Sequence, residues 1–195
     1  QLLLGALDPG AHFGIVAEPR MLTRCFMEAW KAKTDFDYSH QAWADLVGAS
    51  FRDFGAVSEE CFRAIYDEFA KPSAWRIFPD VRPALEGLRA AGVRLGIISN
   101  WDERLRPLLH ALKLADYFEQ IIISHEVGFP KPKCQIFLAA AEALQLHAFE
   151  ILHIGDGTRE DYQGGREAGF SAFLLNRSRP DGEEGTIRSL TELLA

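Results

Sequence analysis

Apolar residues follow two different patterns along the chain, and the pattern changes near Pro79. Across residues 18–71 they recur at helical spacing, and no stretch shows the alternation typical of a strand. The spacing therefore predicts consecutive amphipathic helices, with breaks around residues 34–37 and 55–58 and with Ser58 as a helix cap. The apolar sets are Leu22, Phe26 and Trp30; Trp43, Val47 and Phe51; and Phe62, Ile65, Tyr66 and Phe69.

After Pro79, short apolar runs alternate with segments of helical spacing. The first helix is expected from Asp80, as its cap, to Gly92, as its stop, and Asp102 is expected to cap the next helix. The apolar runs cover residues 93–99, 121–124, 151–155 and 171–175. Short, continuously apolar strands separated by helices indicate a parallel sheet covered on both faces. The predicted fold class is therefore α/β, with a doubly wound parallel sheet.

Composition and charge narrow the class of protein. With 195 residues, 48% hydrophobic and 25% charged, the chain suits one globular domain or a core with a small insertion. A net charge of -7 argues against nucleic acid as a principal partner. The three cysteines form no CxxC pair, which favours a reducing cytoplasm over a disulfide framework. No apolar run approaches the length of a membrane span, so no membrane partner is expected.

Polar residues with compatible chemistry follow three of the predicted strands. Ser99 and Asn100 follow the first strand, Lys131 follows the second, and Asp156 with Asp161 follows the third. The carboxyl ends of parallel strands meet at one edge of a sheet, where such folds bind ligands. A hydroxyl, a cation and two carboxylates suit a phosphate group and Mg²⁺, which takes one or two protein carboxylates and shares an oxygen with the phosphate.

Each of these residues also has a structural interpretation. Asp161 closes a capping box that begins at Thr158, and Lys131 between two prolines could be an ordinary exposed loop lysine. Ser99 and Asn100 could begin a turn. His153, inside a buried strand, is best interpreted as a core histidine with its hydrogen bonds satisfied. The ordered recurrence of the polar groups after successive strands favours a joint site over these separate interpretations.

Three motifs in this order resemble those of the haloacid dehalogenase superfamily: "LGIISNWD", "GFPKPKCQIF" and "LHIGDGTREDYQGGREAG". The pattern of predicted elements and motifs is similar to that of the haloacid-dehalogenase-like hydrolase domain proteins. The resemblance implies a Rossmann-like core with a small all-helical cap, assigned to residues 12–78, and a core of residues 1–11 and 79–195. It also implies that Ser99, Asn100 and Lys131 are catalytic and that Asp156 and Asp161 bind Mg²⁺.

The first motif of the superfamily, which carries the nucleophilic Asp, is not recognisable. Asp8 follows an apolar run, but Pro9 and Gly10 supply neither the second carboxylate nor the Thr of that motif. Asp8 also lies only four residues before His12, where the resemblance to the cap begins. We therefore expect a segment to be absent here, either lost in evolution or omitted from the 195 residues.

The resemblance implies an Mg²⁺-dependent phosphatase that hydrolyses a small phosphomonoester through an aspartyl-phosphate. One alternative is a non-catalytic binding protein of the same fold that lacks its nucleophile. Another is a metal-free haloacid dehalogenase, which the pair Asp156 and Asp161 disfavours because two carboxylates would repel an attacking aspartate.

Overall fold

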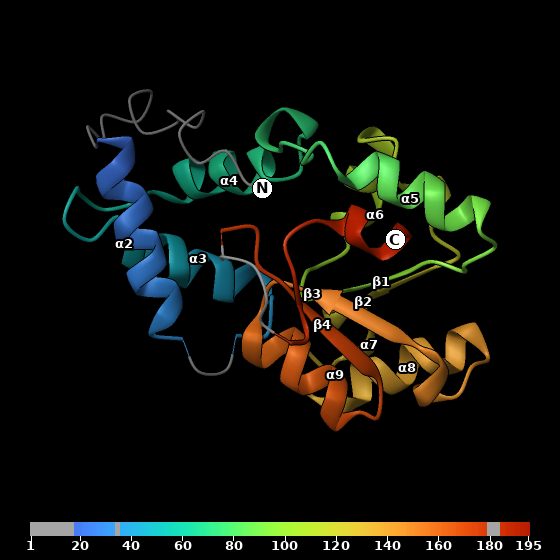
Figure 1. Ribbon diagram of the computed structural model, residues 1–195. Coiled ribbons are helices and arrows are strands. Elements are labelled where there is room, and N and C mark those ends of the chain that lie inside the picture. Colours follow the sequence, from blue (N-terminus) through green and yellow to red (C-terminus); the bar gives the residue numbers. More distant parts are fainter. Residues whose placement is uncertain (1–17, 34–35, 179–183) are drawn as a thin grey trace. The chain divides into compact units, whose positions relative to one another are not determined.

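The computed structural model describes residues 18–33, 36–178 and 184–195. The chain forms two compact units, Gln1–Ile77 and Phe78–Ala195. In Figure 1 the first unit is coloured blue to green, and the second continues from green to red. The predicted division of the chain into a cap of residues 12–78 and a core of residues 1–11 and 79–195 stays a prediction.

The described part of the first unit is helical, as the apolar spacing predicted. Its elements are α2 (Pro19–Lys31), α3 (His40–Ser50), α4 (Glu59–Glu68) and the short η2 (Pro72–Ala74). Ser58 caps α4 as expected, because its hydroxyl accepts a hydrogen bond from the Cys61 amide at 3.1 Å. Ser39 caps α3 in the same way through the Ala42 amide at 3.2 Å.

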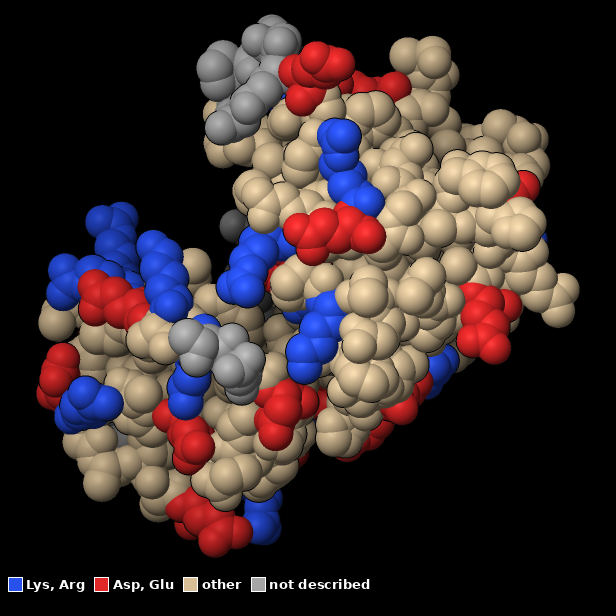
Figure 2. Space-filling view, turned by 90° about the horizontal axis from the view of Figure 1, so that it is seen from below, with Lys and Arg blue, Asp and Glu red and all other residues tan. Residues whose placement is uncertain are grey.

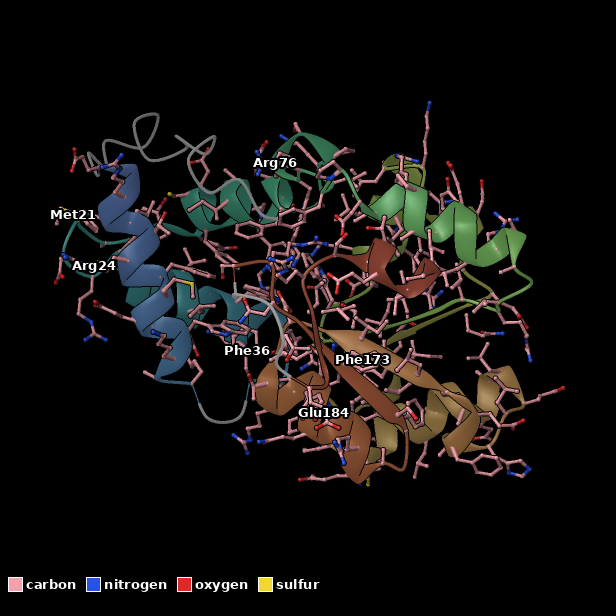
Figure 3. The ribbon with its side chains drawn as sticks, viewed as in Figure 1. Met21, Arg24, Phe36, Arg76, Phe173 and Glu184 are labelled. Carbon is pink, nitrogen blue, oxygen red and sulfur yellow. The ribbon has the colours of Figure 1, made fainter. Side chains whose placement is uncertain are left out.

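Aromatic and aliphatic side chains from α3 and α4 form the core of this unit. The buried members are Val47, Phe51, Cys61, Phe62, Ile65 and Phe69. Leu22 of α2 packs against them, whereas Met21 and Arg24 lie on the opposite, exposed side of that helix (Figure 3). The three helices thus bury the apolar faces that their sequence periodicity indicated.

The second unit alternates helices with short parallel strands, which confirms the predicted fold class. Every strand pairing in the described residues is parallel, with β1 paired to β2, and β4 paired to both β3 and β5. The strands are β1 (Gly96–Ser99), β2 (Gln120–Ile123), β3 (Leu152–Gly155), β4 (Ser171–Leu175) and β5 (Thr186–Ile187). The helices are α5 (Val81–Ala90), α6 (Leu105–Ala111), η3 (Ala115–Tyr117), α7 (Ser124–Val127), α8 (Cys134–Leu144), η4 (Ala148–Glu150), η5 (Thr158–Gln163), α9 (Gly164–Glu167) and η6 (Leu190–Leu194).

Helix α8 packs across both groups of strands. Its residues Ile136 and Phe137 are fully buried, and their cluster includes Ile98 of β1 and Ile122 of β2. The ring of Phe137 also meets His153 of β3 edge-on, with 5.1 Å between centroids. In Figure 1 α7, α8 and α9 lie below the strands, and α5 and α6 lie above them. The two pairing groups therefore share one apolar layer, as expected for strands covered on both faces.

The acidic residues expected as helix caps, Asp80 and Asp102, each bind an arginine side chain. Asp80 directly precedes α5 but makes no capping hydrogen bond; its Oδ2 instead accepts from Arg177 Nη1 at 2.6 Å and from the Leu190 amide at 2.8 Å. Asp102 lies two residues before the N-cap of α6, Arg104, and forms a buried ion pair with that arginine at 2.6 Å. For Asp80, Arg177 and the Leu190 amide, both from the far end of the chain, thus replace the helix amides, whereas Asp102 Oδ1 also accepts from the Arg104 amide at 3.1 Å.

Charged side chains of both signs are interspersed on the face drawn in Figure 2. Exposed pairs in the second unit include Arg94 with Glu119 and Arg106 with Glu126, each at 2.6 Å. Within the described residues, no helix combines the length and apolar character needed to cross a membrane.

Replacing Asp80 by asparagine is expected to destabilise the protein by about 1–3 kcal/mol at pH 7, because the buried hydrogen bonds lose their ionised acceptor. Burial alone would raise the pKa of Asp80, but the hydrogen bonds from Arg177 and Leu190 outweigh it and lower the pKa. This contribution is therefore complete above the unfolded pKa of about 3.9 and is lost as the pH falls through the folded value.

Urea unfolding of wild type and Asp80→Asn from pH 7 to pH 2 measures this dependence. The difference in unfolding free energy between wild type and Asp80→Asn should become smaller below about pH 4. Asp116→Asn, at an exposed aspartate, is the control and should match wild type at each pH. A difference between Asp80→Asn and wild type that stays constant from pH 7 to pH 2 would contradict the assigned role of the carboxylate.

Candidate functional site

Asn100 holds the backbone of Lys131 through two hydrogen bonds. Its Oδ1 accepts from the Lys131 amide at 2.6 Å, and its Nδ2 donates to the Lys131 carbonyl at 2.9 Å. Asn100 directly follows β1, whereas Lys131 lies in the loop between α7 and α8. The next residue, Pro132, fits closely against Gly164, where an added Cβ would lie 2.9 Å from the proline Cα. These contacts position the loop from which the Lys131 side chain extends.

The Lys131 ammonium forms an ion pair with Asp161. Lys131 Nζ lies 2.5 Å from Asp161 Oδ1, and the two side chains are 12% and 6% exposed. His153 Nε2 lies 2.8 Å from the same oxygen, and the Gly157 amide donates to Asp161 Oδ2 at 3.0 Å. Three donors from separate segments thus converge on one buried carboxylate, and its bond to Gly157 retains part of the predicted capping role.

The surroundings of Asp161 favour its ionised form. Burial alone would raise the pKa of this carboxyl group. The hydrogen bond with His153 and the charge and hydrogen bond of Lys131 outweigh burial and hold the pKa well below its usual range. Asp161 is therefore a carboxylate at neutral pH, and Lys131 provides its compensating charge.

Ser99 and Asp156 lie at the ends of β1 and β3, but their side chains take no part in this hydrogen-bond network. Asp156 directly follows β3 and is exposed, and Ser99, the last residue of β1, is partly exposed. Neither side chain hydrogen-bonds to another described residue. The structure thus joins Asn100, Lys131 and Asp161 directly, and it places Ser99 and Asp156 next to this network along the chain.

The carboxylates are compatible with Mg²⁺ but do not form a dedicated cage. Among the described residues, no group of three or more His, Cys, Asp or Glu side chains could enclose a metal ion. Asp161 contacts the backbone on both sides of Asp156, since it binds the Gly157 amide and leaves no room for a Cβ at Gly155. Mg²⁺ usually binds one or two protein carboxylates and keeps several waters or phosphate oxygens, so this donor set fits the ion.

Sequence reasoning did not identify two residues that shape the site. His153 was interpreted as a core histidine, and it is buried, but its partner is Asp161. Ser124, at the start of α7, exchanges hydrogen bonds of 3.1 Å with the amide and carbonyl of Trp101 and so fixes the loop after Asn100. The only available signal was a polar residue within or directly after an apolar strand, which fits core and site residues equally well.

The N-terminal part of the predicted site is the nucleophile motif. Asp8 and His12, on which the expectation of an absent segment rests, lie outside the described residues. Among the described residues the nucleophile is therefore unassigned.

Comparison with known proteins points to one family. The family model for haloacid dehalogenase-like hydrolases matches residues 26–169. The haloacid dehalogenase-like hydrolase domain-containing protein 3 of Bos taurus is 32% identical over 183 residues, covering 87% of this chain and 72% of that protein. A glyceraldehyde 3-phosphate phosphatase of Methanothermobacter thermautotrophicus is 32% identical over 118 residues, covering 57% of this chain and 50% of the phosphatase.

A solved structure shows the same arrangement. The crystal structure of a HAD phosphatase from Thermococcus onnurineus superposes with a TM-score of 0.69 at 27% identity, covering 95% of this chain and 83% of that one. The family match includes β1, β2 and β3 and the network formed by Asn100, Lys131 and Asp161. The chain therefore belongs to the haloacid dehalogenase-like hydrolase family.

Proposed function

We propose that the protein is an Mg²⁺-dependent phosphatase that acts on a small phosphomonoester. The observation that carries the proposal is the buried pair of Lys131 and Asp161, held beside the uncommitted carboxylate of Asp156 at the carboxyl ends of parallel strands. A phosphatase needs a fixed cation for the phosphate and carboxylates for the metal at one place. Phosphatases among the relatives support the same reaction class.

Each of the described site residues would have its own role in catalysis. Lys131 would neutralise a phosphate oxygen, and the Ser99 hydroxyl would donate to another. Asp156, with Asp161, would hold Mg²⁺, which when bound offsets the charge that builds up on the transferring phosphoryl group. Asn100 would keep the Lys131 backbone in place through the bonds described above.

The covalent chemistry would follow the order expected for this family. An aspartate carboxylate attacks phosphorus, the bond between phosphorus and the leaving oxygen breaks, and the alcohol departs after gaining a proton. Water then attacks the aspartyl-phosphate and releases inorganic phosphate, which restores the carboxylate. The aspartate for this step is a separate residue, because Asp161 is engaged by Lys131, His153 and Gly157.

Phosphate release from a panel of phosphomonoesters, measured with and without Mg²⁺, tests the proposal. We expect activity that chelation abolishes, and we expect Asp156→Asn to raise the Mg²⁺ concentration needed for half-maximal activity at least about tenfold. The exposed Asp116 again supplies the control, and Asp116→Asn should keep wild-type Mg²⁺ dependence.

Assays on the same purified protein distinguish the proposed phosphatase from a dehalogenase and from a non-catalytic binding protein. Chloride release from a 2-chloro acid without Mg²⁺ would identify a dehalogenase and overturn the proposal. Mg²⁺-dependent binding of inorganic phosphate without turnover of any ester in the panel would instead support a non-catalytic binding protein.

A further inference from the structure

His153 is fixed by packing on a strand. It is the second residue of β3, is 9% exposed, and meets the ring of Phe137 edge-on at 5.1 Å. On another side it contacts α9, since a Cβ on Gly165 would lie 3.5 Å from the His153 Cβ. A ring confined by α8, α9 and its own strand has little freedom to turn, so the direction of its Nε2 is set by the fold.

Two different kinds of donor reach Asp161 Oδ1. Lys131 contributes a charged ammonium on a long side chain from a loop, and His153 contributes a ring nitrogen from a strand. In the proposed function Lys131 also binds a phosphate oxygen, so its ammonium would shift toward the phosphate and be shared between it and Asp161. The His153 and Gly157 bonds to Asp161 do not depend on that movement.

We propose that His153 is a positioning residue that keeps the Asp161 carboxylate in place while Lys131 engages the substrate phosphate. With its proton on Nε2, the imidazole donates to Oδ1 and, together with the Gly157 amide, holds both carboxylate oxygens. Without Lys131 and His153, the buried carboxylate would keep only the Gly157 amide on Oδ2, and its Oδ1 would have no donor to hold it in place. This inference rests on the proposed function for the role of Lys131.

Three substitutions of His153 separate hydrogen bonding from packing. Glutamine can place an amide nitrogen where the imidazole has Nε2, asparagine reaches only the position of Nδ1, and leucine fills space without a donor. We expect His153→Leu and His153→Asn to weaken Mg²⁺ binding about tenfold, because residues that support metal ligands commonly contribute 10–100-fold. His153→Gln should stay within about threefold of wild type, because it restores the donor.

Calorimetric titration of Mg²⁺ in the presence of inorganic phosphate gives these affinities on the full chain. Phe170→Leu is the control for packing, because Phe170 lies in the same cluster, with its ring 5.6 Å from that of Phe137, and is not among the partners of Asp161. It should lower the thermal midpoint and leave Mg²⁺ affinity unchanged. Equal Mg²⁺ affinity in His153→Leu and wild type would overturn the inference.

A measurement without metal distinguishes failure of this inference from failure of the proposed function. In the metal-free protein, His153→Leu combined with Lys131→Met should lower the thermal midpoint by more than the sum of the single substitutions, since Asp161 then keeps only the Gly157 amide. Additive decreases in the thermal midpoint would overturn the role of His153, whether or not the protein hydrolyses phosphomonoesters. The protein could instead show a larger than additive decrease in thermal midpoint but no Mg²⁺-dependent hydrolysis. That result would confirm that His153 holds Asp161 and would reject the phosphatase function.

Discussion

Replacing Lys131 by methionine is expected to reduce Mg²⁺-dependent phosphate release about 1000-fold, the upper end of the effect of removing one group that stabilises a transition-state oxyanion. Methionine preserves much of the length and apolar surface of the lysine but has no charge. The same substitution removes the cation from a buried ion pair with Asp161. We therefore expect a loss of about 3 kcal/mol in unfolding free energy, the lower end for breaking a buried pair, because His153 and Gly157 still bind the carboxylate.

A double substitution tests the electrostatic origin of that loss. Lys131→Met with Asp161→Asn removes both charges, so much of the stability lost in Lys131→Met should return while activity stays low. Lys133 is the matched control, because it is an exposed lysine two residues further along the same loop. Lys133→Met should change unfolding free energy by less than about 0.5 kcal/mol, as substitutions on the surface usually do. Equal stability of Lys131→Met and Lys133→Met would contradict the buried ion pair.

The alternation of helix and strand was predictable because it depends on local periodicity. The expected strand of residues 171–175 is β4, and the helix expected between Asp80 and Gly92 is α5. Strand starts were less accurate: apolar residues begin at Val93, but β1 begins at Gly96. Apolar character marks the part of the chain that is buried, whereas hydrogen bonding to a neighbouring strand decides where a strand begins.

Long-range charge pairing was not predictable from sequence position. Asp80 lies where a helix cap is common, but its carboxylate binds Arg177 instead of a helix amide. Arg177 is 97 residues from Asp80, and its guanidinium also lies over the Phe78 ring at 4.1 Å from the centroid. A capping pattern describes only nearby amides, so it cannot reveal a competing cation that the fold brings close.

The candidate site could be predicted as a set of residues but not as a network. Motif order pointed to Asn100, Lys131 and Asp161, and the structure joins them. The sequence did not show that Asn100 is committed to the Lys131 backbone, or that Lys131, an ordinary loop lysine by position, has a side chain only 12% exposed. These properties arise when the ends of β1 and β3 are brought together around α8, which local patterns do not encode.

Gly155 provides a test of the geometry that holds Asp161. It is the last residue of β3, and a Cβ there would lie 2.1 Å from Asp161 Cγ, far inside van der Waals contact. Gly155 is therefore required because no side chain fits at this position. Its backbone conformation, which is that of an ordinary strand, does not require glycine. The aspartate cannot move aside cheaply, because Lys131, His153 and Gly157 hold both of its oxygens.

Gly155→Ala is expected to displace the Asp161 carboxylate from its three donors, which costs about 3–5 kcal/mol of unfolding free energy because it breaks a buried charge pair. Mg²⁺ affinity and phosphate release should fall together, since the displaced carboxylate lies beside Asp156. Gly96→Ala is the control: Gly96 also lies in a strand, and an added Cβ would meet only ordinary contacts at 3.5 and 3.6 Å. Urea unfolding and Mg²⁺ titration of both variants give the comparison. If Gly155→Ala is as stable as Gly96→Ala and binds Mg²⁺ as wild type does, Asp161 does not occupy the position that makes it the partner of Lys131.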